Sequence, residues 1–134
     1  MANTLTYNTL EDGERNLIRS LRIASDGSEE TATSLVDVSA FNCSEVRLAS
    51  IKGFIADFQI ELLWDATTDV PICAFGNAAS VGTGVIDIDF TDGGRYPGIP
   101  NTKASGYTGD VFYSTLGTTN LDKAFLVFHF IKIA

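Results

Sequence analysis

The chain contains a single histidine, His129, which limits the catalytic chemistry it could carry out. A Ser-His-Asp or Cys-His arrangement would have to use this one residue, and no nucleophile-elbow motif is present. His129 lies between Phe128 and Phe130, where it would share a strand face with Val127 and Ile131. A metal site would need further ligands at coordinated positions, and none is evident. We therefore interpret His129 as structural and predict no catalytic, cofactor-binding or metal-binding residue.

Three aspartates in the middle of the chain, Asp87, Asp89 and Asp92, resemble a calcium loop because Gly93 follows them. The spacing misses the EF-hand pattern, since Thr91 holds the fifth position and Asp92 the position that requires glycine. Asp87 and Asp89 share one strand face, which is typical of a solvated surface. A glycoside hydrolase would need two facing carboxylates in an aromatic cleft, and spacing alone pairs none. A calcium site and a small hydrolase stay open as alternatives.

The two cysteines, Cys43 and Cys73, lie far apart in the sequence. The chain does not open with a basic region followed by an apolar one, so we expect no signal peptide. We therefore expect the protein to be made in the cytosol. A structural disulfide is disfavoured in a reducing compartment. We therefore predict two buried free thiols, with a bridge as the alternative.

Charge and hydrophobicity exclude two kinds of partner. The formal net charge of −8 argues against nucleic acid and against an anionic membrane surface, because phosphate binding needs clustered lysine and arginine. No apolar run approaches the ~20 residues of a membrane span. A chain of 134 residues is one domain by length and can bury a core without disulfide or metal staples.

Apolar alternation with a period of two predicts strands along most of the chain. The clearest case is residues 57–75, where the row from Phe58 to Trp64 ends at a turn-forming segment, Asp65–Asp69, before an apolar run resumes. This pattern predicts a hairpin that carries the only tryptophan into the core. Further strands are expected over 31–38, 46–53, 85–90, 110–114 and 125–133, and over 15–24, where helical spacing also fits.

The final segment, residues 125–133, is almost continuously apolar and should be covered on both faces, or on one face by a partner. With no convincing long helix, the expected class is a single-domain, all-β antiparallel β-sandwich, jelly-roll-like, of about eight strands. Residues 1–14 are largely polar and are interpreted as an extended N-terminal arm outside a sandwich of residues 15–134. Leu5, Tyr7 and Leu10 give that arm enough apolar character to contact a neighbouring subunit.

Residues 91–109 form the most unusual stretch, with no periodicity, five glycines and two prolines. Loops this long are uncommon inside compact domains and are usually functional or flexible. Arg95, Tyr96 and Tyr107 are of types enriched at protein interfaces. We predict a partner-contact loop, with a simple surface flap as the alternative.

Several segments, together with a terminal apolar strand that ends in Lys132, resemble small virion structural proteins of tailed phages, particularly marine and cyanobacterial ones. These segments are Leu63-Trp64-Asp65-Ala66-Thr67, Asp89-Phe90-Thr91-Asp92-Gly93-Gly94 and Thr108-Gly109-Asp110-Val111-Phe112. The resemblance covers roughly residues 34–133. In such relatives an apolar residue is expected after the Gly-Gly pair, where this chain has Arg95.

The resemblance implies a short, acidic, non-enzymatic head decoration (cement) protein that binds the major capsid protein on the outside of the head. It would be assembled in the host cytoplasm. Because a shell offers many equivalent sites at symmetry axes, a homo-oligomer, possibly a trimer, is expected. The alternative is a carbohydrate- or receptor-binding β-sandwich module of a tail or fibre.

Overall fold

The protein is described by a computed structural model that covers residues 3–56, 58–76, 83–118 and 120–133. These residues form nine strands and one short 3-10 helix, η1 (Val38–Phe41). The strands are β1 (Thr4–Asp12), β2 (Asn16–Asp26), β3 (Thr33–Val36), β4 (Glu45–Ala56), β5 (Gln59–Trp64), β6 (Val70–Gly76), β7 (Thr83–Asp89), β8 (Val111–Leu116) and β9 (Asn120–Ile133). The all-β prediction is confirmed, and the segment with ambiguous spacing, β2, is a strand. No helix among the described residues is long and apolar enough to cross a membrane.

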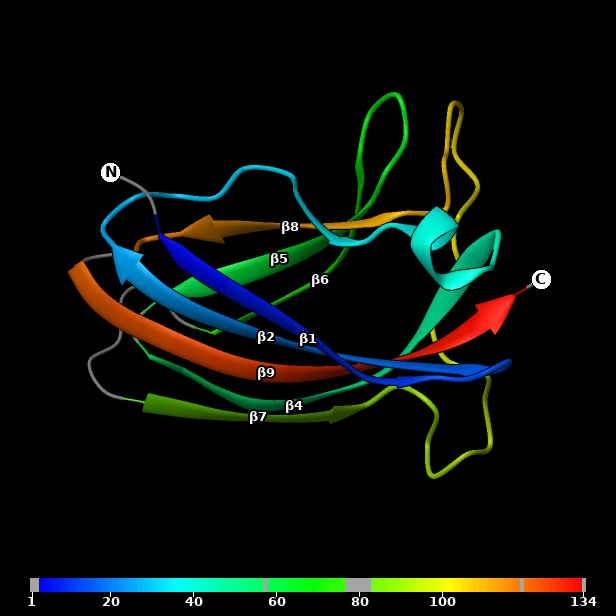
Figure 1. Cartoon of the computed structure of the whole chain (residues 1–134), viewed down its shortest axis with the longest axis horizontal. Helices are drawn as coiled ribbons and strands as arrows, with labels where there is room; N and C mark the ends of the chain where they lie inside the picture. Colours follow the sequence, from blue (N-terminus) through cyan, green and yellow to red (C-terminus); the bar gives the residue numbers. More distant parts are fainter. Residues whose placement is uncertain (1–2, 57, 77–82, 119, 134) are drawn as a thin grey trace.

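The strands form two antiparallel sheets that pack face to face (Figure 1). Sheet A has the order β1-β2-β9-β4-β7, and sheet B has the order β3-β8-β5-β6. From β2 to β9 the strands divide into two groups of four, β2-β9-β4-β7 and β3-β8-β5-β6, in the order expected for a jelly roll. Most pairings join strands that lie far apart in the sequence, such as β2 with β9.

The core lies between the two sheets and is built from the inward-facing residues of the alternating strands. Trp64 and Tyr113 from sheet B belong to the same core cluster as Phe128 and Phe130 from sheet A, and each of the four is at most 1% exposed. The rings of Phe128 and Phe130 are stacked, with centroids 6.2 Å apart. The predicted hairpin is confirmed as β5 and β6, and it places Trp64 in the core opposite Val70.

The last strand is buried on one face only. Leu126, Phe128 and Phe130 are fully buried, as expected for the inner face. On the outer face Phe125 is 40% exposed and Val127 is half-buried. The first alternative, burial of both faces within the chain, is therefore wrong, and cover of the outer face by a partner stays a prediction. The pattern of continuous hydrophobicity indicated burial, but it did not distinguish the core from an uncovered sheet face.

The N-terminal segment requires a correction, because it is extended but is not a separate arm. Over Thr4–Asp12 it is the edge strand β1 of sheet A, paired antiparallel with β2 from Thr4↔Ala24 to Asp12↔Leu17. Leu5 and Tyr7 pack against the core. The buried Asn3 amide donates to the Ser28 carbonyl at 2.9 Å. Residues 1 and 2 of the expected arm lie outside the described residues.

Candidate partner-binding face

The long connection between β7 and β8 is fastened to sheet A near its middle, at Ile99. The N–H of Leu48 donates to the Ile99 carbonyl at 3.0 Å, and the N–H of Ile99 donates to the Leu48 carbonyl at 2.9 Å. Gly98, at φ +88°, lies so close that a Cβ there would be 2.5 Å from the Leu48 carbonyl oxygen. This attachment divides the connection into a tip loop, residues 91–97, and a second loop, residues 102–109.

The tip loop is held to the end of β7 by the carboxylate of Asp89. Asp89 accepts hydrogen bonds from the N–H of Thr91 at 2.8 Å and from the N–H of Gly93 at 2.9 Å, and also one from the Thr91 hydroxyl. These hydrogen bonds favour the ionised form and lower the pKa of Asp89 to about 2. A backbone hydrogen bond closes the tip loop, since the N–H of Tyr96 donates to the Thr91 carbonyl at 2.8 Å.

The second loop packs against the β5–β6 turn of sheet B. The hydroxyl of Thr108 donates to Asp65 at 2.6 Å, and the N–H of Thr67 donates to the Ser105 carbonyl at 3.0 Å. In Figure 1 the tip loop and the second loop project from opposite sides of the sandwich. The predicted contact loop is therefore two separate surfaces, and Tyr107 does not lie with Arg95 and Tyr96.

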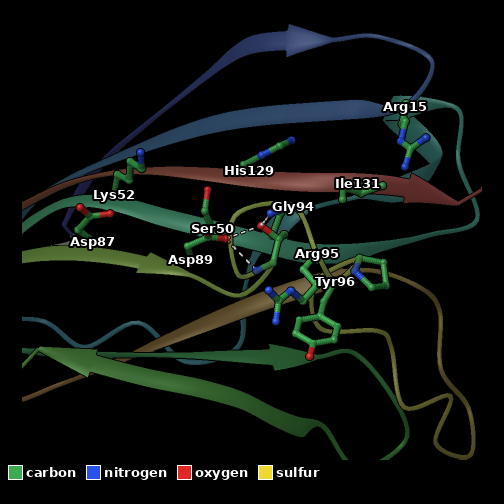
Figure 2. A pocket seen from close by; sticks show the side chains of 13 residues that line it. Arg15, Ser50, Lys52, Asp87, Asp89, Gly94, Arg95, Tyr96, His129 and Ile131 are labelled. Atoms are coloured by element: carbon green, nitrogen blue, oxygen red, sulfur yellow. Dashed lines mark hydrogen bonds between the residues drawn. The ribbon is translucent and has the colours of Figure 1, made fainter.

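A cleft of about 710 Å³ lies between the tip loop and the outer face of sheet A. Figure 2 shows the charged and polar side chains of that face beside the two tip-loop side chains. Its lining includes Lys52, Asp87, Asp89, Arg95, Tyr96 and His129. The imidazole of His129 is 3.0 Å from the Asn16 side-chain oxygen, which agrees with the structural interpretation of this residue. Lys52 stands directly opposite Asp87 in the register of β4 and β7.

Next to the cleft, three apolar side chains cross the outer face of sheet A as one row. Phe54 on β4 is paired in register with Phe125 on β9 on one side and with Val85 on β7 on the other. Side chains directly opposite each other on neighbouring strands have Cβ atoms about 5 Å apart. Phe54 and Phe125 are each 40% exposed and Val85 is 83% exposed. We call these three residues the apolar row.

The predicted contact residues are dispersed over the molecule. Leu5 and Tyr7 point toward the core, and the exposed Leu10 lies at the β1 edge of sheet A, at a register shift between Thr9 and Glu11. Arg95 and Tyr96 line the cleft together. Arg95 lies 3.7 Å from Asp92 in an exposed ion pair.

Sequence reasoning missed the apolar row, although part of its pattern was visible. Val85 is an apolar residue on the strand face that also carries Asp87 and Asp89. An apolar side chain on an otherwise charged face could have indicated a contact residue. Phe54 and Phe125 could not be joined to Val85 without the register of β9, β4 and β7, which pairs positions about 30 to 70 residues apart.

Outside the cleft and the apolar row, the candidates for chemistry among the described residues are metal-ligating clusters and the two thiols. No group of three or more histidine, cysteine, aspartate or glutamate side chains among them could hold a metal ion. Cys43 and Cys73 are free thiols, as predicted, although each is only half-buried. Burial raises the pKa of Cys73 to about 11, so its reactive thiolate form is scarce at neutral pH.

No protein-family model matches the sequence, and no curated protein matches it significantly. Among solved structures, the fold is similar to two mutants of family 29 carbohydrate-binding modules. One, a complex with mannohexaose, is 9% identical with a TM-score of 0.31, and the other is 11% identical with a TM-score of 0.31. Each comparison covers 94% of this chain and 92% of the other.

Proposed function

We propose that the protein is a non-enzymatic structural component of a tailed-phage virion. In this proposal it binds the outside of the head shell through the outer face of sheet A and acts as a decoration (cement) protein. The observation that carries the proposal is the apolar row, which lies one rung along sheet A from the Lys52–Asp87 pair at the cleft. An exposed strip of two phenylalanines and a valine across a sheet is a surface suited to another macromolecule.

The side chains of this face favour a protein partner. The side chains of the apolar row contain no polar atom, whereas Lys52 and Asp87 lie on the next rung of the same face. An apolar centre with a charged and polar margin is the usual composition of a protein–protein interface. Tyr96 and Arg95 at the edge of the cleft are also residue types enriched at interface hot spots.

The proposed partner is the major capsid protein in its assembled form. Support comes from the sequence resemblance to small phage head proteins and from the formal net charge of −8, which disfavours nucleic acid as the partner. A protein that binds assembled subunits in preference to free ones stabilises the shell by mass action. Arrays of equivalent sites on the shell would add avidity if the protein is oligomeric.

Quantitative mass spectrometry of purified virions tests this proposal. A head decoration protein is expected on the order of hundreds of copies per particle, because a shell repeats one site many times. Immunogold labelling of intact virions should place it on the head. A handful of copies, or labelling confined to the tail, would contradict a cement role.

A second candidate function is carbohydrate binding in the cleft, as in a tail or fibre module. The observation that favours it is the lining of the cleft, where Tyr96 could stack on a sugar ring and Asp87 and Arg95 could hydrogen-bond its hydroxyl groups. Binding of the isolated protein to a panel of immobilised polysaccharides, with Tyr96→Ala as the control variant, tests this candidate. Saturable binding that the Tyr96→Ala change abolishes would favour carbohydrate binding over binding to the head shell.

A further inference from the structure

The two sheets have four edge strands, and three of them carry features that discourage pairing with another chain. In β1 the pairing shifts between Thr9 and Glu11, and β3 is only 4 residues long. In β6 the strand contains Pro71 next to a register shift. Bulges, short length, proline and charged side chains are the usual means by which proteins protect exposed sheet edges.

The fourth edge, β7, has no register shift and no proline over its described length, and it is 7 residues long. It pairs with β4 without a shift from Ser50↔Asp89 to Ala56↔Thr83. It contains no proline and no lysine. Its only charges, Asp87 and Asp89, lie in the C-terminal half, so the segment around Val85 is a regular strand edge that no described strand covers. An exposed, regular and apolar edge is a template for strand addition.

We propose that β7 pairs antiparallel with β7 of a second copy of this chain, so that two copies of sheet A join into one continuous sheet. This inference goes beyond the proposed function and does not depend on what the apolar row binds. It is a two-fold pairing in which the same strand contributes from both copies.

The charges of β7 restrict the register of such a pair. A two-fold axis at Asp87 would place the two Asp87 side chains opposite each other, and an axis at Ile88 would place Asp87 opposite Asp89. Like charges directly opposite each other in a sheet are destabilising. An axis at Val85 or at Ile86 avoids both conflicts, but an axis at Ile86 would place the apolar Val85 opposite Asp87 of the second copy.

The axis at Val85 also brings apolar side chains of the two copies together. It places Val85 against Val85 of the second copy, so the two apolar rows become one strip of six residues across the joined sheets. It places Gly84 opposite Ile86, where the absence of a side chain on glycine leaves room for the isoleucine. Val85, at 83% exposed, is the residue that gains most from being covered.

Mass measurement of the purified protein by light scattering or sedimentation is the first part of the test. The expected result is a dimer, twice the 14.4 kDa of one chain. Val85→Lys should convert it to a monomer that is still folded, because a lysine on the edge opposes pairing. A monomeric parent protein, a trimer, or a dimer that Val85→Lys leaves intact would overturn the proposal.

Cysteine cross-linking then tests the register, in a background in which Cys43 and Cys73 are replaced by alanine. Val85→Cys should form an intermolecular disulfide under mild oxidation, since directly opposite residues have the Cα separation that a disulfide needs. Asp87→Cys is the matched control on the same strand face, where an axis at Val85 would hold the two cysteines more than about 10 Å apart. Equal cross-linking of the two variants would overturn this register. Because the test uses the protein alone, its failure would leave the shell-binding proposal standing.

Discussion

The hydroxyl oxygens of Tyr7 and Tyr113 lie 2.7 Å apart and form a hydrogen bond between the two sheets. Tyr7 comes from the edge strand β1 of sheet A, and Tyr113 is a fully buried residue of β8 in sheet B. Burial raises the pKa of both hydroxyl groups above their ordinary value, so both stay protonated at physiological pH. The N-terminal strand is therefore bonded to the centre of the sandwich.

Tyr7→Phe should destabilise the protein, because it leaves the buried Tyr113 hydroxyl without this partner. The expected loss in the free energy of unfolding is about 1–3 kcal/mol, measured by urea denaturation. The double variant Tyr7→Phe/Tyr113→Phe is the control, since removing both hydroxyl groups leaves no unpaired polar group. If the single and double variants lose the same stability, the hydrogen bond does not hold β1 to sheet B.

Replacing Phe128 with alanine should cost about 3–5 kcal/mol, because its ring is fully buried between the sheets. Phe125→Ala is a matched control three residues earlier on the same strand, where the ring lies on the exposed outer face. The control should lose markedly less stability in the same denaturation experiment. Similar losses for the two variants would mean that the outer face of β9 is covered in the isolated protein.

Gly98→Ala should weaken the attachment of the long connection to sheet A. A methyl group there would meet the Leu48 carbonyl oxygen at 2.5 Å, in addition to the strain of a positive φ. Gly94→Ala isolates the strain alone, since Gly94 also has a positive φ but no neighbour within 4 Å of the added carbon. The strain should cost roughly 1–2 kcal/mol. The thermal midpoint of Gly98→Ala should fall further than that of Gly94→Ala, and equal midpoints would argue against the close packing at Leu48.

The sandwich could be predicted from alternation because its strands bury one face. Strand β1 was missed as a strand because Thr4, Thr6 and Asn8 make it polar and only Leu5 and Tyr7 turn inward. The pairing of β2 with β9 joins the two ends of the chain, and local patterns carry no information about it. For the same reason the apolar row emerged only from the sheet register, whereas the exposed Arg95 and Tyr96 could be selected by residue type.

The tip loop should keep its structure in mild acid. The pKa of Asp89 is about 2, below its ordinary value of 3.8, because the ionised carboxylate accepts the Thr91 and Gly93 hydrogen bonds. A depressed pKa means that this contribution is present above pH 3.8 and is lost as the pH falls through about 2.

An NMR titration of the Asp89 carboxyl carbon checks the pKa, and amide protection of residues 91–97 reports the structure of the loop. Asp89→Asn should lower that protection already at neutral pH. A titration midpoint near 3.8 would contradict the hydrogen bonding described for this carboxylate.

Co-sedimentation with purified heads stripped of the protein tests the central claim, that the outer face of sheet A binds the shell. Wild-type protein should rebind to saturation, and Phe54→Ser/Phe125→Ser should bind at least about tenfold more weakly, a loss of roughly 1.4 kcal/mol. Leu116→Ser is the matched control, because Leu116 is a 60% exposed apolar residue on sheet B. It should bind like wild type, and all three proteins should show unchanged far-UV circular dichroism. Undiminished binding of the Phe54→Ser/Phe125→Ser variant, or no binding of the wild-type protein, would contradict the account.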